Sequence, residues 1–470
     1  MAEYYVDFLA GDNANPGTAE SPWKTPPQFG GGGPGTTITS ADTLYVAGSI
    51  TAEGSGSALW QVNTGRYQSG CKIRGWPGRG RFFIDAARTW SRVVAINGVA
   101  TEFSDADLTG SREDEETSVG LEVLGVAAAG TIVRNVRAFD NGRFGIRLNN
   151  VGADARITLI DVTANDNTTL PTDNGGAGRY AAGISVEGSG KCVLLRCQAH
   201  NNGRTALREG TDVDGRGISI SGVSSAGTKV LDCVTSGNGD PTGILSPTGT
   251  PNGTSLEGFN CSSIYVRGFR SSGEAAGAEI KYAANDWTIE HSVFAGTGIT
   301  FQWGQFSGTG STGLVLRNVT LINDGVQPFA DCLAISSGNA EIRNVVVWKR
   351  GRSDWMPVRF SSGQFSFDPA TIVIDGIADI NNNDPLGRLV KHVTSGGTVY
   401  YTREEWRVLH PSHFANYHAL QHDQISTHVR PLPDTSLLTD GVDLGYVRDL
   451  DGKQSRKHIG AYGAARLRSV

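Results

Sequence analysis

Ile132-Val-Arg-Asn-Val136 is an apolar strand broken by one small polar residue, and variants of this phrase return seven more times along the chain. The central residues of the eight copies are Asn135, Asp161, Cys197, Cys233, Gly268, His291, Asn318 and Asn344. They lie 26, 36, 36, 35, 23, 27 and 26 residues apart. A period of this size is typical of a solenoid, in which each repeat buries its apolar face only against its neighbours.

A second strand occurs in each repeat, and it opens with Gly-Ile or a close variant. Copies begin at Gly145, Gly183, Gly217, Ala278 and Gly298. Side chains alternate across a strand, which predicts the inward-pointing set Ile184, Val186, Ile218, Ile220 and Ile280. Turns such as Asp140-Asn-Gly-Arg separate the strands, and no segment of helical length remains for a crossover helix. We therefore predict an all-β fold, a parallel β-helix with rungs ~4.8 Å apart.

The eight central residues should form one column in such a stack. Asn135, Asn318 and Asn344 can hydrogen-bond from rung to rung at a bend, and Cys, Gly and Asp fit the same narrow corner. We interpret the whole column as scaffold, including Asp161 and His291.

Composition and charge exclude several classes of protein. Glycine accounts for 63 of the 470 residues, which favours turns and strands over helices. The formal charge is −6, from 41 basic and 47 acidic side chains, and no basic run occurs. We therefore expect no nucleic-acid partner. No apolar run is long enough to cross a bilayer, so membrane insertion is not expected either.

The start of the chain, Met-Ala-Glu-Tyr-Tyr-Val-Asp, shows no basic region followed by an apolar core, so no signal peptide is visible. We expect a virion component, such as a part of a phage tail, or an extracellular protein whose signal peptide has been removed.

The six cysteines and the C-terminal histidines show no metal-binding spacing. Most of the cysteines should be small buried hydrophobes. A histidine-rich set is expected to pack against the last rungs: His410, His413, His418, His422 and His428. We predict no metal site and no cofactor, except that lyase chemistry could use Ca²⁺.

These patterns divide the chain into three parts. Residues 1–70 form an N-terminal lead-in or cap, 71–384 the parallel β-helix, and 385–470 an irregular C-terminal closing segment. The phrase Cys71-Lys-Ile-Arg-Gly is predicted to be the first regular rung, and the rungs should end near Asp375.

Both ends of the chain resemble the right-handed parallel β-helix proteins of the pectate-lyase-like class. The start, with Tyr4-Tyr-Val, Asn15-Pro-Gly-Thr, Pro22-Trp-Lys-Thr and Asp42-Thr-Leu-Tyr-Val, is similar to the opening segment of that class. The end, with Asp443-Leu-Gly-Tyr-Val-Arg and Ile459-Gly-Ala-Tyr, is similar to its closing segment, although Gly463 replaces the usual acidic residue. The resemblance implies a right-handed, single-stranded parallel β-helix.

The class includes polysaccharide lyases, glycoside hydrolases, epimerases, phage tailspikes and non-enzymatic surface proteins, so the resemblance implies an architecture more than an activity. The Asn-Thr-Asp, Gly-His-Gly and Arg-Ile-Lys signatures of polygalacturonases do not occur in the sequence. No catalytic residue is therefore carried over from that group.

Three consecutive repeats between Asp161 and Gly268 are about ten residues longer than the others. The extra residues must leave the solenoid as loops, which are Thr168–Ala182, Arg204–Arg216 and Asn238–Glu257. Stacked loops form a wall beside a flat sheet. The resulting groove suits an extended polymer.

Carboxylates near these loops are the candidate catalytic groups, namely Asp212, Asp214 and Glu187. Alternation turns the carboxylates of Asp212 and Asp214 to the same side. Paired carboxylates can act as acid and base in glycoside cleavage, whereas a Lys or Arg near acidic groups and Ca²⁺ can abstract a proton beside a uronate. The competing interpretation is a solvated turn or a structural cation site.

The candidate substrate-binding residues are Arg208, Arg216, Glu279, Lys281 and Trp303. Glu279 should lie on the order of 10 to 15 Å from Glu187, at ~4.8 Å per rung. Trp303 belongs to a set of late tryptophans, with Trp287, Trp348 and Trp355, whose rings can stack on sugars or pack loops and subunits. Glu279 and Lys281 can equally form an exposed ion pair of little consequence.

Together these features predict a phage tailspike-like protein that recognises and depolymerises a bacterial surface polysaccharide. The resemblance implies a homotrimer attached to other virion proteins. Two alternatives stay open. One is a non-catalytic virion or cell-surface protein with a structural or receptor-binding role, and the other is a secreted polysaccharide lyase or epimerase.

Overall fold

The computed structural model describes residues 1–112, 117–167, 180–203, 214–239, 253–304, 310–323, 331–349, 356–361, 369–380, 386–414 and 417–420. The chain divides into two compact units. The first comprises Met1–Lys229, Gly237–Asp240 and Ile244–Thr250, and the second comprises Val230–Ser236, Pro241–Gly243 and Pro251–Val470. Within the described ranges, no helix is long and apolar enough to span a membrane.

The first unit is built from two sheets. Sheet A1 contains β1 (Glu3–Asp7), β2 (Thr43–Ala47), β3 (Ser49–Thr51), β5 (Lys72–Gly75), β6 (Phe82–Asp85), β8 (Glu102–Thr109), β10 (Ile132–Phe139), β12 (Thr158–Ile160), β13 (Thr163–Asn165), β15 (Val193–Leu195) and β16 (Gln198–His200). Sheet B1 contains β4 (Trp60–Asn63), β7 (Arg92–Asn97), β9 (Val119–Leu124), β11 (Phe144–Gly152), β14 (Tyr180–Ser189) and β17 (Asp214–Ser221). Short 3₁₀ turns follow two B1 strands, at Val126–Ala128 and Val223–Ser225.

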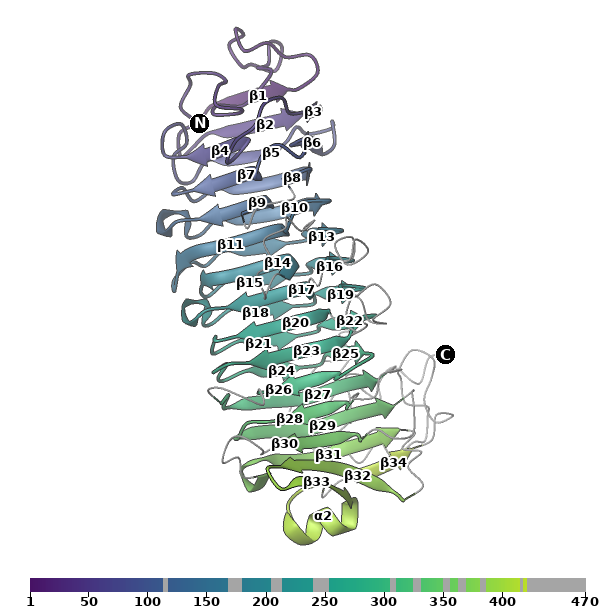
Figure 1. Ribbon diagram of the computed structural model, residues 1–470. Coiled ribbons are helices and arrows are strands. Elements are labelled where there is room, and N and C mark those ends of the chain that lie inside the picture. The colour runs from purple at the N-terminus through teal and green to yellow at the C-terminus, as the bar shows by residue number, and fades with distance from the viewer. Residues whose placement is uncertain are drawn as a thin grey trace, which may run out of the picture. The chain divides into compact units, whose positions relative to one another are not determined.

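The strands of both sheets stack in chain order. In sheet B1 the paired strands run β4-β7-β9-β11-β14-β17, and every pair is parallel (Figure 1). In sheet A1, β8 pairs with β10, and β10 pairs with β12 and β13, again in parallel. Because the chain visits A1 and B1 in turn, each repeat adds one rung, and parallel strands joined by crossovers coil to the right. The unit is a right-handed parallel β-helix, as predicted.

The second unit repeats this arrangement. Sheet A2 contains β19 (Val234–Ser236), β21 (Tyr265–Arg267), β22 (Arg270–Ser272), β24 (Thr288–Glu290), β25 (Val293–Gly296), β27 (Leu314–Asn323), β29 (Ala340–Lys349), β31 (Val373–Ile380) and β34 (Tyr417–Leu420). Sheet B2 contains β20 (Thr254–Phe259), β23 (Ala276–Lys281), β26 (Phe301–Trp303), β28 (Leu333–Ile335), β30 (Val358–Ser361), β32 (Arg388–Thr394) and β33 (Gly397–Thr402). A 3₁₀ turn spans Pro369–Thr371, and helix α2 spans Arg403–Leu409. Strand β18 (Lys229–Leu231) belongs to both units, because the chain passes from the first to the second between Lys229 and Val230.

Alternation along the strands places the core as predicted. The five inward residues of the sequence pattern are all fully buried, namely Ile184, Val186, Ile218, Ile220 and Ile280. All six cysteines are buried and free of disulfides. Burial raises the pKa of Cys192 and of Cys261 to about 12, so these thiols are packing groups with little thiolate character.

Rungs extend beyond the range 71–384 at both ends. Strand β1 pairs in parallel with β2, and β2 pairs with β5, so regular rungs begin before Cys71. At the other end, β30 pairs with β32 and β31 with β34, also in parallel. The reason is local alternation: Leu44 and Val46 in β2 point inward and are fully buried, as in the later rungs.

The column of small polar residues needs one correction of register. Asn135, Asp161, Gly268, His291, Asn318 and Asn344 have positive φ, as a bend between two strands requires. In the two remaining copies the bend residue is Arg196 or Asp232, and the predicted Cys197 and Cys233 each lie one residue later. These two cysteines are fully buried, because they occupy the inward position that Val136 holds in its own rung. The predicted rung-to-rung hydrogen bond is present between Asn344 Nδ2 and Asn318 Oδ1, at 3.2 Å.

A longer asparagine ladder, which the sequence reasoning missed, lies inside the first unit. It comprises the fully buried Asn141, Asn167, Asn202 and Asn238. The side-chain amide of each of the first three donates to the side-chain carbonyl oxygen of the next, at 3.1, 3.0 and 2.7 Å. The ladder also explains two of the Gly-Ile openings, because a Cβ on Gly145 or Gly183 would lie 2.7 Å from the Nδ2 of Asn167 or Asn202.

Replacing Asn202 by alanine is expected to destabilise the first unit by about 3 kcal/mol, because it leaves buried donors and acceptors of both neighbours without partners. Urea denaturation followed by circular dichroism measures the loss. The matched control is Asn165→Ala, which removes an exposed amide bonded to Asp166 and should lower the stability by less than about 0.5 kcal/mol. Equal losses in the two variants would contradict a stabilising ladder.

Helix α2 is attached to the second unit by aromatic packing. Thr402 and Glu405 form a reciprocal capping box at its start. The buried Trp406 stacks on Phe360 with ring centroids 5.0 Å apart. His413 accepts a hydrogen bond at Nδ1 from Trp406 Nε1 at 3.1 Å, and His410 stacks beside it, in line with the predicted packing role of these histidines. The side chains of His418, His422 and His428 lie outside the described part.

Stability should fall on acidification because of His413. Burial lowers the pKa of His413, since desolvation disfavours the imidazolium, and a proton on Nδ1 would also remove the bond from Trp406. A folded pKa below the ordinary value of ~6.5 means that this stability is fully present above ~6.5 and is lost as pH falls below it. Thermal midpoints measured between about pH 7 and pH 5 should decline less in His413→Gln than in the wild type. An identical decline would contradict this role.

Candidate functional site

The predicted loops depart from matching points of the first unit. Residues 168–179, 204–213 and 240–252 lie outside the described part, and Asp212 and Arg208 lie among them. The flanks are described. The first two loops leave after Asn167 and Gly203, where the Gly203 amide donates to the Asn167 carbonyl at 2.8 Å. They return at Tyr180 and Asp214, which are partners in the β14–β17 register. The described residues on either side of these two segments therefore lie at neighbouring positions of adjacent rungs.

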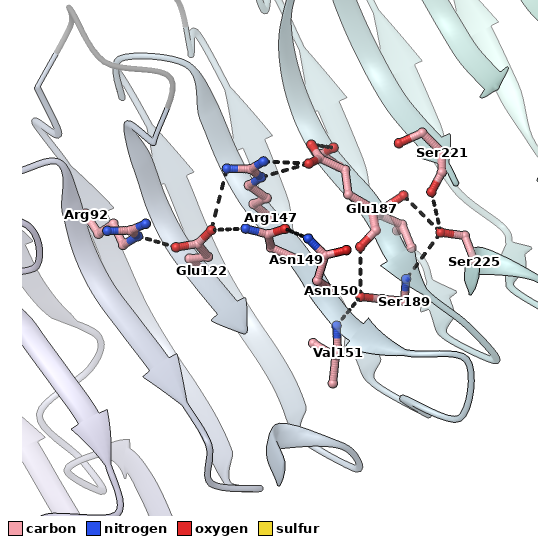
Figure 2. Close-up of polar contacts among 12 residues, drawn as sticks. Arg92, Glu122, Arg147, Asn149, Asn150, Val151, Glu187, Ser189, Ser221 and Ser225 are labelled. Atoms are coloured by element: carbon pink, nitrogen blue, oxygen red, sulfur yellow. Dashed lines mark hydrogen bonds and ion pairs between the residues drawn. The ribbon is translucent and has the colours of Figure 1, made fainter. Parts of the chain in front are cut away.

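Polar side chains form a continuous row on the outer side of sheet B1. We call this row the polar face, and it comprises Arg92, Glu122, Arg147, Asn149, Ser185 and Glu187. Arg147 of β11 pairs in register with Glu122 of β9, and Asn149 pairs with Glu187 of β14. Figure 2 shows Arg92, Glu122, Arg147 and Glu187 pointing toward one another across neighbouring strands. Positive and negative groups thus alternate from rung to rung.

Glu187 is the accessible carboxylate of the polar face. Its Oε2 accepts from Arg147 Nη2 at 2.6 Å and from Arg147 Nε at 3.1 Å, and its Oε1 accepts from Ser185 Oγ at 2.7 Å. The Glu187 side chain is 16% exposed. Two charge-assisted bonds to a planar guanidinium fix the orientation of this carboxylate.

Glu122 is paired on both sides and has no exposed surface. Arg92 Nε donates to it, and Asn149 Nδ2 donates to it at 2.9 Å. Arg147 Nη1 lies 3.6 Å from Glu122 Oε1, so the Arg147 guanidinium is held between two carboxylates. Because a buried carboxylate cannot reach a ligand, Glu122 is a positioning group for Arg147.

Two further contacts make this part of the face rigid. Arg147 lies 5.0 Å from the ring centroid of Phe144, which forms a buried apolar cluster with Val119 and Ala182. Behind Glu187, the Ser189 hydroxyl donates to the Glu187 carbonyl at 3.1 Å and accepts from the Val151 amide at 3.1 Å (Figure 2). Side chain and backbone of Glu187 are therefore both held in place, as a preorganised site requires.

Asp214 and Arg216 lie at the other end of the same strands. Asp214 pairs with Tyr180, whereas Glu187 pairs with Ser221. Seven residues of extended chain separate these register positions, which is roughly 20 Å. Two carboxylates that divide acid and base roles in inverting glycosidases lie roughly 6.5 to 9.5 Å apart. The structure therefore does not bring Asp214 together with Glu187, and Asp214 instead pairs with Arg216 at 3.1 Å.

In the second unit, Glu279 and Lys281 do form the ion pair that the sequence allowed. Lys281 Nζ lies 2.9 Å from Glu279 Oε2, and Thr254 Oγ1 donates to the same oxygen at 3.2 Å. Both side chains are largely buried, which makes the pair less exposed than predicted. Because Glu187 and Glu279 belong to different units, their predicted separation stays a prediction.

Trp303 requires a correction. It pairs in register with Ile280 and Ile335, on the inward side of sheet B2, and has no exposed surface. Its ring therefore belongs to the core and offers no face to a sugar. Gln302 takes the outward position of that strand, beside Glu279. Trp287 and Trp348 are buried as well, and Trp355 lies outside the described part.

The second unit also contains a buried charge cluster that the sequence did not reveal. Asp331, whose side chain is 2% exposed, lies 2.9 Å from Arg359 Nη1 and 3.7 Å from Lys391 Nζ. Burial raises the pKa of the Asp331 carboxyl, although the two cations oppose this effect. Asp331 precedes β28, whereas Arg359 lies in β30 and Lys391 in β32, so the three groups come from separate rungs and no local motif could have indicated them. Perturbed buried groups of this kind occur both in functional sites and in structural ion pairs.

Among the described residues, no group of three or more His, Cys, Asp or Glu side chains converges in a way that could hold a metal ion. The acidic residues of the polar face are each bound to arginine instead. The chemistry that the described site offers is thus that of a carboxylate and a guanidinium.

No protein-family model matches the chain, and no curated protein sequence matches it. Solved structures do. They include pectate lyase Pel9A, with 12% identity over 98% of this chain and 96% of that chain and a TM-score of 0.47. A rhamnogalacturonan lyase matches with 14% identity over 79% of this chain and 86% of that chain, TM-score 0.43. The Dettilon tailspike protein matches with 11% identity over 76% and 59%, TM-score 0.38. The chain is an all-β protein with the right-handed parallel β-helix fold.

Proposed function

We propose that the first unit binds a uronate-bearing bacterial surface polysaccharide along the polar face and cleaves it by proton abstraction, in a phage tailspike-like protein. The observation that carries the proposal is Glu187, an accessible carboxylate oriented by Arg147 and Ser185 on the outside of a sheet. A base that is fixed and reachable beside a cation is what proton abstraction next to a carboxylate needs.

The dimensions of the polar face support a polymeric ligand. Its groups come from β7, β9, β11 and β14, four consecutive strands of sheet B1. Neighbouring rungs are ~4.8 Å apart, close to the length of one sugar ring, so a glycan lying across the strands can present one ring to each rung. Strands β14 and β17 begin at Tyr180 and Asp214, the end away from Glu187, and Arg216, Asp212 and Arg208 are proposed as further contacts.

Elimination fits this arrangement better than hydrolysis. Hydrolysis by two carboxylates requires a second accessible carboxylate near Glu187. Among the described residues, Glu122 is enclosed and Asp214 is roughly 20 Å away along the strand. A lyase needs only a base and a cation that stabilises the developing negative charge.

The proposed step transfers the proton from the carbon that bears the uronate carboxylate to Glu187. The electron pair of that C–H bond forms a double bond to the neighbouring carbon, and the bond from this carbon to the glycosidic oxygen breaks. The oxygen leaves with a proton from solvent. Arg147, released from a neutralised Glu187, then faces the charge that develops on the substrate carboxylate.

The test is incubation of the protein with a panel of capsular and lipopolysaccharide glycans, with and without uronates. Chain length is measured by size-exclusion chromatography, and the new double bond by its ultraviolet absorbance. We expect shortened, absorbing products from uronate-bearing glycans. Shortening without absorbance would replace elimination by hydrolysis, and no shortening across the panel would contradict a depolymerase.

A non-catalytic glycan-binding protein is the second candidate, and one observation favours it. Glu187 and Arg147 satisfy each other's hydrogen bonds, as structural ion pairs do. Binding without shortening in the same assay would support this function.

An epimerase would share the proton abstraction and would change the sugar without shortening the chain. The location in a virion or outside the cell, the homotrimer and the attachment to other virion proteins belong to the proposal, and light scattering tests the trimer.

A further inference from the structure

A separate cavity of about 430 Å³ opens on the sheet A1 side of the first unit. It lies at the loop between β5 and β6, and its lining includes Tyr45, Trp76, Arg74, Arg81, Asp105 and Asn135. The polar face belongs to sheet B1, so the two sites lie on different sheets of the unit. The volume is within the range of small-ligand pockets, and a single sugar ring with its substituents fits it.

Aromatic rings supply one side of this cavity. The guanidinium carbon of Arg79 lies 4.0 Å from the centroid of the Trp76 ring, and Arg79 is itself bonded to Asp7 at 2.5 Å. Tyr5 supports both rings, with centroids 4.8 Å from Trp76 and 5.3 Å from Tyr45. Every other tryptophan with a described side chain is buried, so Trp76 is the partly exposed indole of the described chain. An immobilised, partly exposed ring is suited to the C–H face of a sugar.

Fixed polar groups surround the rings. The Asp105 carboxylate accepts from Ser104 Oγ and from Asn135 Nδ2, both at 2.7 Å. Arg81 bonds Asn135 Oδ1 at 2.5 Å and holds it in place. Arg74 Nη2 donates to Glu102 at 2.6 Å, while Arg74 Nε is buried and has no hydrogen-bond partner among the described residues. The Asp105 carboxylate and the guanidinium of Arg74, whose side chain is 35% exposed, therefore flank the aromatic wall.

The charges indicate an uncharged ligand. Arg74 and Arg81 are already neutralised by Glu102 and Asp107, and Asp105 adds a negative charge to the lining. A site for an anion would leave guanidinium groups free of carboxylates. We propose that this cavity binds one neutral pyranose ring, with its C–H face on the aromatic wall and its hydroxyl groups bonded to Asp105 and Arg74. The inference rests on the proposed function only in assigning that ring to the same polysaccharide.

Methyl glycosides of glucose, galactose, mannose, N-acetylglucosamine and rhamnose are the probes, with glucuronate as the anionic comparison. Saturation-transfer NMR and intrinsic fluorescence measure binding to the full chain. We expect at least one neutral glycoside to bind with a Kd on the order of 1 mM, as the small number of contacting atoms allows. Because Trp76 is the partly exposed indole, the same sugar should change the fluorescence.

Variants identify the site. Trp76→Ala should remove both signals, whereas Trp76→Phe should keep saturation transfer and lose the fluorescence change, which serves as the test even if the alanine variant folds poorly. Glu187→Gln should bind the glycoside as the wild type does, and Trp76→Ala should still cleave soluble polysaccharide. A cavity that binds no sugar can therefore be distinguished from a polar face that does not cleave. No binding of any neutral glycoside, preference for glucuronate, or an unchanged signal in Trp76→Ala would overturn the inference.

Discussion

Glu187→Gln is expected to lower the rate of polysaccharide cleavage by about 10²- to 10⁴-fold, the usual contribution of a general base. Glutamine keeps the size of the side chain and an oxygen that can accept from Ser185, but its amide cannot take up a proton. Arg147 retains its contact with Glu122, so the polar face should keep its arrangement. Initial rates from the ultraviolet assay measure the effect, and thermal midpoints confirm that the variant is folded.

A matched control exists in the second unit. Glu341 accepts from Arg317 Nε at 3.1 Å and from Arg317 Nη2 at 2.8 Å, the same two-pronged geometry that Arg147 makes with Glu187. Its side chain is also partly exposed. Glu341→Gln should leave cleavage unchanged. If both variants cleave at the wild-type rate, Glu187 is a structural ion-pair partner and the base lies elsewhere.

Trp303→Ala is expected to lower the stability of the second unit by about 3 to 5 kcal/mol, as loss of a buried large aromatic side chain does. Trp303 has no exposed surface and lies in register between Ile280 and Ile335, so its removal leaves a cavity that the stacked rungs cannot fill. Because solenoids can unfold in parts, hydrogen exchange of the amides of β23, β26 and β28 is a better measure than a single melting curve.

Trp303→Phe should keep most of the packing and therefore lose much less stability. Glycan binding in this variant should equal that of the wild type, since the ring faces the core. A Trp303→Ala variant with wild-type exchange rates and weakened glycan binding would instead reinstate the sugar-stacking role and contradict the buried position.

The inward faces of the fold could be predicted because they depend on local alternation. Ile184 and Ile220 are buried for the same reason that Val136 is, and each can be recognised from its own strand. The bend column was predicted less well. The sequence pattern predicts Cys197 at the bend, whereas Arg196 has the left-handed backbone, because residue size alone does not distinguish a bend residue from the small inward residue after it.

The asparagine ladder can be predicted from the sequence. Asn141, Asn167, Asn202 and Asn238 each follow the A-sheet strand of their repeat at matching positions, and a second alignment of the repeats on these residues would have found them. Their mutual bonds follow from parallel stacking, since equivalent residues of consecutive rungs lie one above another.

The candidate site was only partly predictable. Glu187 can be named from its place near the long loops, but its partner Arg147 comes from an earlier rung, 40 residues away in the sequence. Glu122, the second carboxylate that contacts Arg147, lies 65 residues from Glu187. Asp214 was grouped with Glu187 because both lie near the long loops. The register instead places them at opposite ends of neighbouring strands.

The sequence by itself determined the repeat, the inward residues and the position of the long loops, because the burial pattern of a rung depends on the alternation of a few consecutive residues. Only the tertiary structure decided which charges meet. Arg147 lies between Glu122 and Glu187 because the rungs stack in one register, and Trp303 is core because its strand presents Gln302 outward. Contacts between rungs depend on the register in which the rungs stack, which the lengths of all the intervening loops set together. No pattern within a single strand encodes that register.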